Sequence, residues 1–187
     1  NWGGAGNEGI FVLPPAGTID AAHLNGVKIL GTLFFMPRTI GGRDGWIEAM
    51  LTKDESGSYP YAVKMYEIAK YFGFDGWFIN KELDNGKRVD EWGDFIKCFC
   101  ETAVAAGDTQ MEIQWYDAHN SPTMEILQKH QNISQFLEYG STGDKSEYAS
   151  ELGCSANDLL HRLYSGIECS QAGLYGFTMP SEGSVAL

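Results

Sequence analysis

The sequence is poor in basic residues and in long apolar runs. Its 187 residues contain 13 Lys and Arg against 25 Asp and Glu, a formal net charge of -12. This balance argues against a nucleic acid or an anionic membrane surface as partner, because either would need a basic patch. No apolar run approaches the roughly 18 residues of a membrane span, and no N-terminal signal pattern is present. A neutral substrate is compatible with this composition.

Cysteine and histidine are also scarce, with four of each. Cys98, Cys100, Cys154 and Cys169 lack the spacing of a zinc site, and the segment 98–100 is not a redox CxxC motif. We therefore expect free thiols that are buried or partly buried. The histidines are scattered singly along the chain. No metal centre and no other cofactor is predicted.

What the sequence does contain is short apolar runs that alternate with helical or turn-rich segments. Six runs are strand candidates, at 10–13, 27–35, 74–79, 111–115, 136–139 and 163–167. Helical spacing marks 61–71 and 88–106, and Ser155, with Asp158 three residues later, is a candidate N-cap for a helix over 156–164. Strands that alternate with helices predict βαβ units and hence a parallel sheet.

Two architectures fit this alternation, an open doubly wound sheet and a closed barrel. The open sheet usually carries a glycine-rich phosphate loop, and neither GxGxxG nor GxxxxGK occurs here. In a barrel, functional residues lie at the carboxyl ends of the strands, and Asn80, Glu82, Tyr116 and Asp117 fall there. We therefore predict an α/β fold of the TIM-type (β/α)8 barrel class. Because a full barrel takes about 250 residues, we expect residues 1–187 to form most of one catalytic barrel domain.

The stretch 76–82, GWFINKE, begins as an apolar strand and ends in an amide, an ammonium and a carboxylate. Side chains alternate along a strand, so Asn80 and Glu82 share one face and lie about 6.5 Å apart along it. An amide and a carboxylate placed in this way can address two neighbouring atoms of one substrate. We expect nearby aromatic side chains to desolvate the Glu82 carboxyl and raise its pKa toward the working range of a general acid; these are Phe74, Trp77, Phe78 and Trp115.

The pair differs from the two carboxylates of the usual glycosidase, because Asn80 cannot be a nucleophile. Substrate-assisted hydrolysis of an N-acetylhexosamine tolerates this difference, since the 2-acetamido oxygen of the sugar attacks C1 while a protein amide orients it. The alternative is an ordinary polar strand end before a turn. The strand at 111–117 favours a catalytic role over this alternative. Glu112, Gln114 and Tyr116 would face a barrel interior, where burying a polar group costs free energy unless it is hydrogen-bonded or contacts a substrate.

Several motifs then agree in order along nearly the whole chain: residues 2–4, 21–27 with 30–32, 74–82 and 111–117. Together they resemble the strand motifs of glycoside hydrolase family 85, the endo-β-N-acetylglucosaminidases. The resemblance implies a hydrolase with a (β/α) barrel that cleaves the GlcNAcβ1-4GlcNAc core of N-linked glycans, so that the substrate is an N-linked glycan or glycoprotein. It also implies retention of configuration through an oxazolinium intermediate, which would permit transglycosylation.

Carried over by position, the resemblance makes Glu82 the general acid/base, Asn80 the residue that orients the acetamido group, and Tyr116 a residue that holds that group. The same strand supplies Trp115, Asp117 and Gln114 as candidate substrate-binding residues. Asp117 and Gln114 could equally be satisfied structural groups.

Three positions depart from the family pattern and put substrate preference in doubt: Ser141 stands where an aromatic residue is usual, Glu138 where Asn is common, and Glu168 where Asp is usual. The resemblance also implies that the first strand and most of the last are missing, which would leave the barrel unclosed. Family members include secreted bacterial and cytosolic proteins; a secreted or cell-surface bacterial location is favoured.

Two alternatives to family 85 stay open at this point. One is a chitinase-type barrel of glycoside hydrolase family 18, whose DGxDxDxE signature aligns with residues 75–82 but has two aspartates replaced by Phe78 and Asn80. The other is a non-catalytic carbohydrate-binding barrel.

Overall fold

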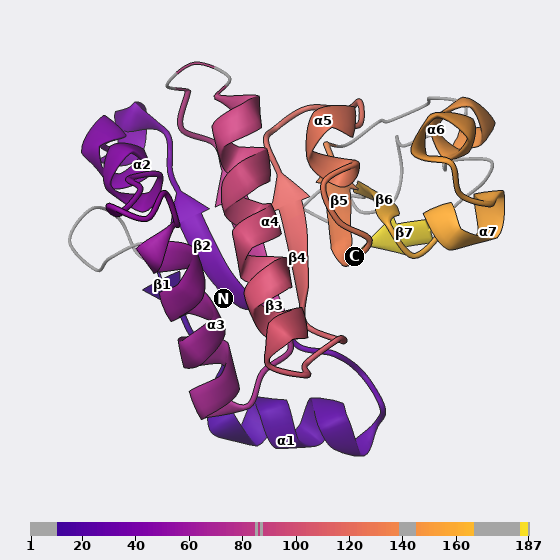
Figure 1. Cartoon of the computed structure of the whole chain (residues 1–187). Helices are drawn as coiled ribbons and strands as arrows, with labels where there is room; N and C mark the ends of the chain where they lie inside the picture. The colour runs from indigo at the N-terminus through magenta and orange to yellow at the C-terminus, as the bar shows by residue number, and fades with distance from the viewer. Residues whose placement is uncertain (1–10, 85, 87, 139–144, 167–183, 187) are drawn as a thin grey trace.

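The computed structural model describes residues 11–84, 86, 88–138, 145–166 and 184–186 (Figure 1). One seven-stranded sheet runs through it, in the order of the chain from β1 to β7. The strands are β1 (Phe11–Val12), β2 (Gly31–Phe35), β3 (Gly76–Lys81), β4 (Glu112–Tyr116), β5 (Ile133–Leu137), β6 (Leu163–Gly166) and β7 (Ser184–Ala186). All neighbours pair in parallel except β1, which is antiparallel to β2. The predicted α/β fold with a mainly parallel sheet is confirmed, and β1 is the exception.

Helices connect the strands. They are α1 (Ala16–Leu24), α2 (Asp44–Met50), α3 (Pro60–Phe72), α4 (Val89–Ala105), α5 (Met124–Leu127), α6 (Lys145–Leu152) and α7 (Ala156–Leu159), with a 3-10 turn η1 at Arg38–Ile40. The two helices predicted from apolar spacing, at 61–71 and 88–106, correspond to α3 and α4. In Figure 1, α3 and α4 lie side by side over one face of the central strands, and α1 lies below the amino ends of those strands. None of the described helices is both long and apolar enough to cross a bilayer.

Local sequence explains where some of these helices begin and end. Pro60 occupies the first turn of α3, where its missing N–H costs no hydrogen bond, and Gly73 ends the helix with φ 80°. Before α7, Ser155 and Asp158 form the predicted capping box. The predicted extension of this helix to residue 164 is wrong, because α7 ends at Leu159 and β6 starts at Leu163.

The hydrophobic core lies between the sheet and its covering helices. Trp77 and Ile79 from β3 are fully buried there, together with Phe95 and Phe99 from α4. The indole Nε1 of Trp77 donates to the carbonyl oxygen of Met65 in α3 at 3.0 Å, so the helix and the strand are also joined by a buried hydrogen bond. Alternate residues of β3 therefore face the helices, and the residues between them face the other side of the sheet.

The thiols behave as predicted in the described part of the chain. Cys98, Cys100 and Cys154 are free; Cys100 is buried and the other two are partly buried. Burial raises the pKa of the Cys100 thiol to about 12, so this group stays protonated at neutral pH. Cys169 lies outside the described residues.

Candidate active site at the carboxyl ends of the strands

The chain continues along β2 just past the last residue of β3. Leu83 is fully buried in the same core as Trp77 and Ile79. The main-chain N–H groups of Glu82 and Leu83 both donate to the carbonyl oxygen of Phe35 in β2, at 3.0 and 2.8 Å. The chain thus stays beside β2 beyond Lys81. Alternation along β3 places Asn80 on the face opposite the helices, and the burial of Leu83 in the core is compatible with Glu82 on the face of Asn80.

The amide of Asn80 is buried and finds no hydrogen-bond partner in the part of the chain that the structure describes. Its side chain is 1% exposed, and neither Nδ2 nor Oδ1 has a partner among the described residues. Leaving a buried polar group unpaired costs about 1–3 kcal/mol. Of the described residues, Asn80 is the one with two such atoms on one buried side chain. A ligand that brings one donor and one acceptor, as an acetamido group does, would satisfy both.

Tyr116 ends β4 and is the register partner of Asn80. The centroid of its ring lies 5.6 Å from that of Phe136, and the two ring planes are nearly perpendicular, at 77°. The Phe78 ring is 6.2 Å away on the same face of β3 as Asn80. The Tyr116 hydroxyl donates to Glu138 Oε2 at the end of the neighbouring strand β5. The structure therefore adds a carboxylate, Glu138, to the group that the sequence predicted.

The other predicted site residues divide between the two faces of the sheet. Gln114 pairs in register with Phe78 and lies on the face of Tyr116, one layer nearer the amino ends. Trp115 is 1% exposed and packs against Trp92 of α4, with ring centroids 5.4 Å apart. Its burial in the core weighs against direct contact with a sugar.

Asp117 holds the loop that follows β4. Its carboxylate accepts hydrogen bonds from Thr123 Oγ1 at 2.7 Å and from Gln135 Nε2 at 3.4 Å. The Gln135 side chain in turn accepts from the Thr123 main-chain N–H at 2.7 Å. These contacts are those of a satisfied structural group, which is one of the two roles that the sequence left open for Asp117.

The predicted aromatic surroundings of Glu82 are wrong in part. Phe74, Trp77 and Trp115 all lie in the core between the sheet and the helices, which is the face opposite to Glu82. Phe78 alone of the four shares the face of Asn80 and Glu82. Period-two alternation explains this for Trp77, which points to the side of β3 opposite to Asn80. Phe74 precedes β3, and Trp115 belongs to β4.

Lys81 points away from Asn80 and lines a cavity of about 200 Å³ together with Trp115, Asp117, His119 and Thr123. Burial lowers the pKa of its ammonium, and the nearby carboxylates of Asp117 and Asp84 oppose that shift. Lys81 therefore lies on the side of the sheet opposite to Asn80.

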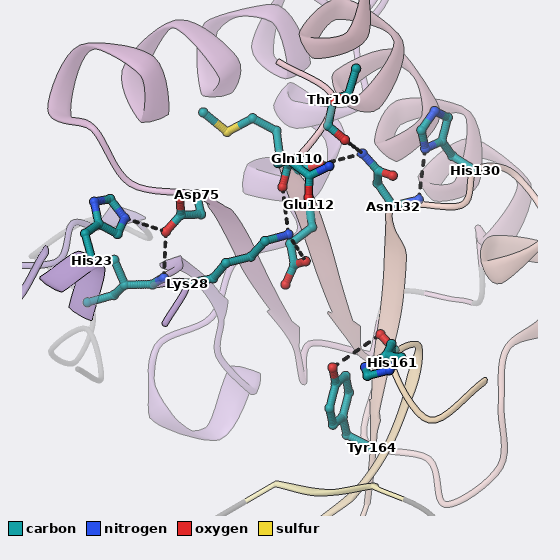
Figure 2. Close-up of polar contacts among 12 residues, drawn as sticks. His23, Lys28, Asp75, Thr109, Gln110, Glu112, His130, Asn132, His161 and Tyr164 are labelled. Carbon is teal, nitrogen blue, oxygen red and sulfur yellow. Dashed lines mark hydrogen bonds and ion pairs between the residues drawn. The ribbon is translucent and has the colours of Figure 1, made fainter. Parts of the chain in front are cut away.

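Polar groups also gather at the opposite, amino ends of the strands (Figure 2). There Lys28 Nζ donates to Glu112 Oε2 and to the carbonyl oxygen of Gln110, both at 2.8 Å. Asp75 Oδ2 accepts from the main-chain N–H of Ile29 and pairs with His23 Nε2, also at 2.8 Å. These groups satisfy one another, which is typical of a stabilising role at this end of barrel strands. Nowhere in the described ranges do three His, Cys, Asp or Glu side chains gather in a way that could hold a metal ion.

A family model, several known proteins and solved structures match this chain. The sequence model described as glycosyl hydrolase family 85 matches residues 2–181. Cytosolic endo-beta-N-acetylglucosaminidase 1 of Arabidopsis thaliana is 37% identical over 186 residues, a match that covers 91% of this chain and 25% of that protein. The human cytosolic endo-beta-N-acetylglucosaminidase is 41% identical over 70 residues, which cover 37% of this chain and 9% of the human one.

A solved structure with the same fold is the glycoside hydrolase domain of Endo-D (Spr0440) from Streptococcus pneumoniae R6. It superposes with a TM-score of 0.71 at 26% identity, and the match covers 92% of this chain and 30% of that one. The chain therefore spans less than a third of the length of each of these relatives.

Proposed function

This chain belongs to glycosyl hydrolase family 85, and from that membership we propose that it cleaves the GlcNAcβ1-4GlcNAc core of N-linked glycans, leaving one GlcNAc on the protein. Because the chain belongs to family 85, we do not propose the family 18 alternative. The similarity to relatives named as endo-beta-N-acetylglucosaminidases supports the proposed activity.

We propose further that residues 1–187 form most of one catalytic barrel of the TIM type. The sequential order of the strands and the parallel pairing from β2 to β7 support this architecture. So does the superposition on the Endo-D domain. In such a barrel, Asn80, Glu82 and Tyr116 stand at the carboxyl ends of the strands, where barrel enzymes carry their active sites.

In the proposed reaction, the Glu82 carboxyl gives its proton to the glycosidic oxygen while the 2-acetamido oxygen of the substrate attacks C1. The leaving sugar departs as an alcohol and an oxazolinium ion forms. Glu82, now a carboxylate, then removes a proton from the water that attacks C1. Because C1 is inverted twice, the product retains its configuration, and a sugar hydroxyl in place of water would give transglycosylation.

The observation that carries this proposal is the amide of Asn80. A nucleophilic carboxylate at this position would fit the usual retaining glycosidase, and a purely structural amide would be hydrogen-bonded. The Asn80 amide is buried and lacks a partner among the described residues. It supports a substrate that supplies both the nucleophile and the missing hydrogen bonds.

The test replaces Glu82 with Gln and compares two donors. With an N-glycan, Glu82→Gln should slow hydrolysis by about 10²- to 10⁴-fold, the usual contribution of a general acid. With a preformed glycan oxazoline the loss should be much smaller, because its ring opening needs no protonated leaving group.

The matched control is Glu55→Gln, at an exposed position, which should leave both rates unchanged. Equal hydrolysis of the N-glycan by the wild type and Glu82→Gln would remove Glu82 from the proposed role. Binding of the glycan without cleavage by the wild type would favour a non-catalytic carbohydrate-binding barrel.

A further inference from the structure

A cavity of about 600 Å³ lies at the amino ends of the strands, the end of the sheet opposite to Asn80. We call it the amino-end cavity, and Figure 2 shows Lys28, Glu112 and His161 of its lining. Sites for small organic ligands usually measure about 300–1,000 Å³, so this cavity has room for one. The lining residues that carry the argument below are Lys28, Glu112, Ser134, Cys154, Asp158 and Arg162.

Arg162 brings a half-buried positive charge to this cavity. Its Nε donates to the carbonyl oxygen of Ile133 at 3.0 Å, and its Nη2 donates to those of His130 at 3.0 Å and Leu127. A guanidinium has five N–H groups, so the two on Nη1 are left without a partner among the described residues. No ion pair within the described ranges includes Arg162. A buried charge without a counter-charge is costly, and the carbonyl oxygens offset only part of that cost.

Ser134 supplies a second, independent observation. It is 5% exposed and lines the same cavity, and its hydroxyl finds no partner in the part of the chain that the structure describes. Buried hydroxyls are normally hydrogen-bonded. The main-chain N–H of Gln135 donates to the carbonyl oxygen of Arg162 at 2.8 Å. Ser134 and Arg162 therefore lie on neighbouring segments of the sheet, and both present donors that lack an acceptor.

The carboxylates that line the cavity already have partners. Glu112 Oε2 accepts from Lys28 Nζ at 2.8 Å. Asp158 Oδ2 accepts from the hydroxyl and the main-chain N–H of Ser155, at 2.7 and 3.2 Å. The Lys28 ammonium also donates to the carbonyl oxygen of Gln110 at 2.8 Å, which leaves one of its three N–H groups. The unsatisfied groups of this lining are thus donors, and two of the side chains that carry them are cationic.

We propose that the amino-end cavity binds a small phosphate compound, whose phosphate group accepts hydrogen bonds from Arg162 Nη1 and from the Ser134 hydroxyl. A phosphate group has enough oxygens to accept from both Nη1 N–H groups and from a hydroxyl at once, and arginine suits it through its planar N–H groups. The cavity is larger than the phosphate group needs, so it also has room for an organic part. This site is separate from the proposed glycan site, which lies at the carboxyl ends of the strands.

The first test follows the Tm with four additives: inorganic phosphate, glucose 6-phosphate, glucose, and chloride at matched ionic strength. Both phosphates should raise the Tm by about 2–4 °C relative to chloride, because a ligand that binds the folded state stabilises it. Glucose should give no such rise. A rise with glucose equal to that with glucose 6-phosphate would overturn phosphate as the group that is bound, and no rise with either phosphate would overturn the site.

Ser134→Ala localises the effect. Without additive, its Tm should equal or exceed that of the wild type, because the substitution removes a buried hydroxyl that lacks a partner. Its apparent Kd for phosphate should rise by about tenfold or more, since a hydrogen bond to a charged group is lost.

The matched control is Ser165→Ala. Ser165 is 1% exposed and its hydroxyl also lacks a partner among the described residues, but it is not one of the residues that line the cavity. The apparent Kd for phosphate should stay at the wild-type value in this variant. An equal increase in Kd in Ser134→Ala and Ser165→Ala would overturn the proposed site.

A second readout uses the thiol that lines the cavity. Phosphate at about ten times its Kd should slow the alkylation of Cys154 by iodoacetamide by about tenfold, because only the unbound fraction reacts. Cys98, which is also half-buried but lies outside the cavity lining, should react at an unchanged rate. Peptide mass measures both rates.

Arg162→Gln should remove this protection of Cys154. Because that substitution also affects three hydrogen bonds to the main chain, Ser134→Ala serves as the parallel variant and should weaken the protection as well. Unchanged alkylation of Cys154 in the presence of phosphate, or full protection in Ser134→Ala at the same phosphate concentration, would overturn the proposal.

Discussion

Asn80 is the residue on which the proposed chemistry depends most, because its buried amide satisfies no group of the described protein. Such a group lowers the stability of the free protein and is retained where a ligand uses it. Alternation along β3 was enough to predict from the sequence that Asn80 and Glu82 share a face. The partnership of Tyr116 with Glu138 could not be predicted in this way, because it depends on how two strands separated by a loop and a helix pair with each other.

We predict that Asn80→Leu stabilises the protein and inactivates it. An apolar side chain of similar shape removes the unpaired amide, so the free energy of unfolding should rise by about 1 kcal/mol or more. Activity on an N-glycan should fall by at least about tenfold, because nothing then orients the acetamido group. Urea denaturation and a glycan-cleavage assay measure the two effects.

The control is Asn132→Leu, because the Asn132 amide donates to the carbonyl oxygens of Thr109 and Met111 at 2.8 and 2.9 Å (Figure 2). This variant should lose about 1–3 kcal/mol of stability. A comparable loss in Asn80→Leu would mean that the Asn80 amide is a structural group.

At the level of strands and helices, the sequence predicted the elements whose periodicity is regular and misplaced those whose ends depend on distant contacts. The strand at β5 was expected over 136–139, and the structure places it at Ile133–Leu137, with Ser134 and Gln135 inside it. Both are buried in β5, and the Gln135 amide is satisfied by Thr123 and Asp117. These polar residues therefore belong to a strand that pairs with β4 and β6, and the hydrogen bonds of the Gln135 side chain come from the loop after β4.

The end of α7 shows the same limit. Its capping box is local and was predictable from Ser155 and Asp158. Its end is set beyond the helix, where Arg162 donates to the carbonyl oxygens of Ile133 and His130, both at 3.0 Å, and to that of Leu127. No sequence pattern within residues 156–164 predicts these hydrogen-bond partners.

Gly76 is a position in β3 at which a side chain would not fit. Its φ is 138°, and a Cβ built there would lie 1.9 Å from the carbonyl oxygen of Glu112 in β4. We predict that Gly76→Ala destabilises the protein by about 3 kcal/mol or more, through backbone strain and a clash that no side-chain rotation can relieve. Thermal or urea unfolding measures the loss.

The matched substitution is Gly17→Ala in α1, where a Cβ would meet nothing within 4 Å. This change should be neutral or stabilising by about 0.5–1 kcal/mol, since Ala favours a helix over Gly. If Gly76→Ala were as stable as Gly17→Ala, the close approach of β3 to β4 would be contradicted, and with it the register that places Asn80 beside Tyr116.

At the scale of the whole molecule, the two ends of the sheet differ in how their polar groups are used. The amino ends carry groups that satisfy one another, such as Lys28 with Glu112 and His23 with Asp75. The carboxyl ends carry the amide of Asn80, which no described residue pairs with. This contrast agrees with the proposed barrel, because barrel enzymes carry their active sites at the carboxyl ends of the strands and stabilising groups at the amino ends. The formal net charge of -12 is compatible with a neutral glycan, whose recognition needs no basic surface.

The most direct test of the proposed function is the mass of a glycoprotein with high-mannose N-glycans before and after incubation with the protein, with chitin oligomers as the parallel substrate. We expect each glycosylated asparagine to keep a single GlcNAc, the rest of the glycan to be released intact, and the chitin oligomers to remain uncleaved. A glycoprotein of unchanged mass, or one that has lost both core GlcNAc residues, would contradict the proposed activity.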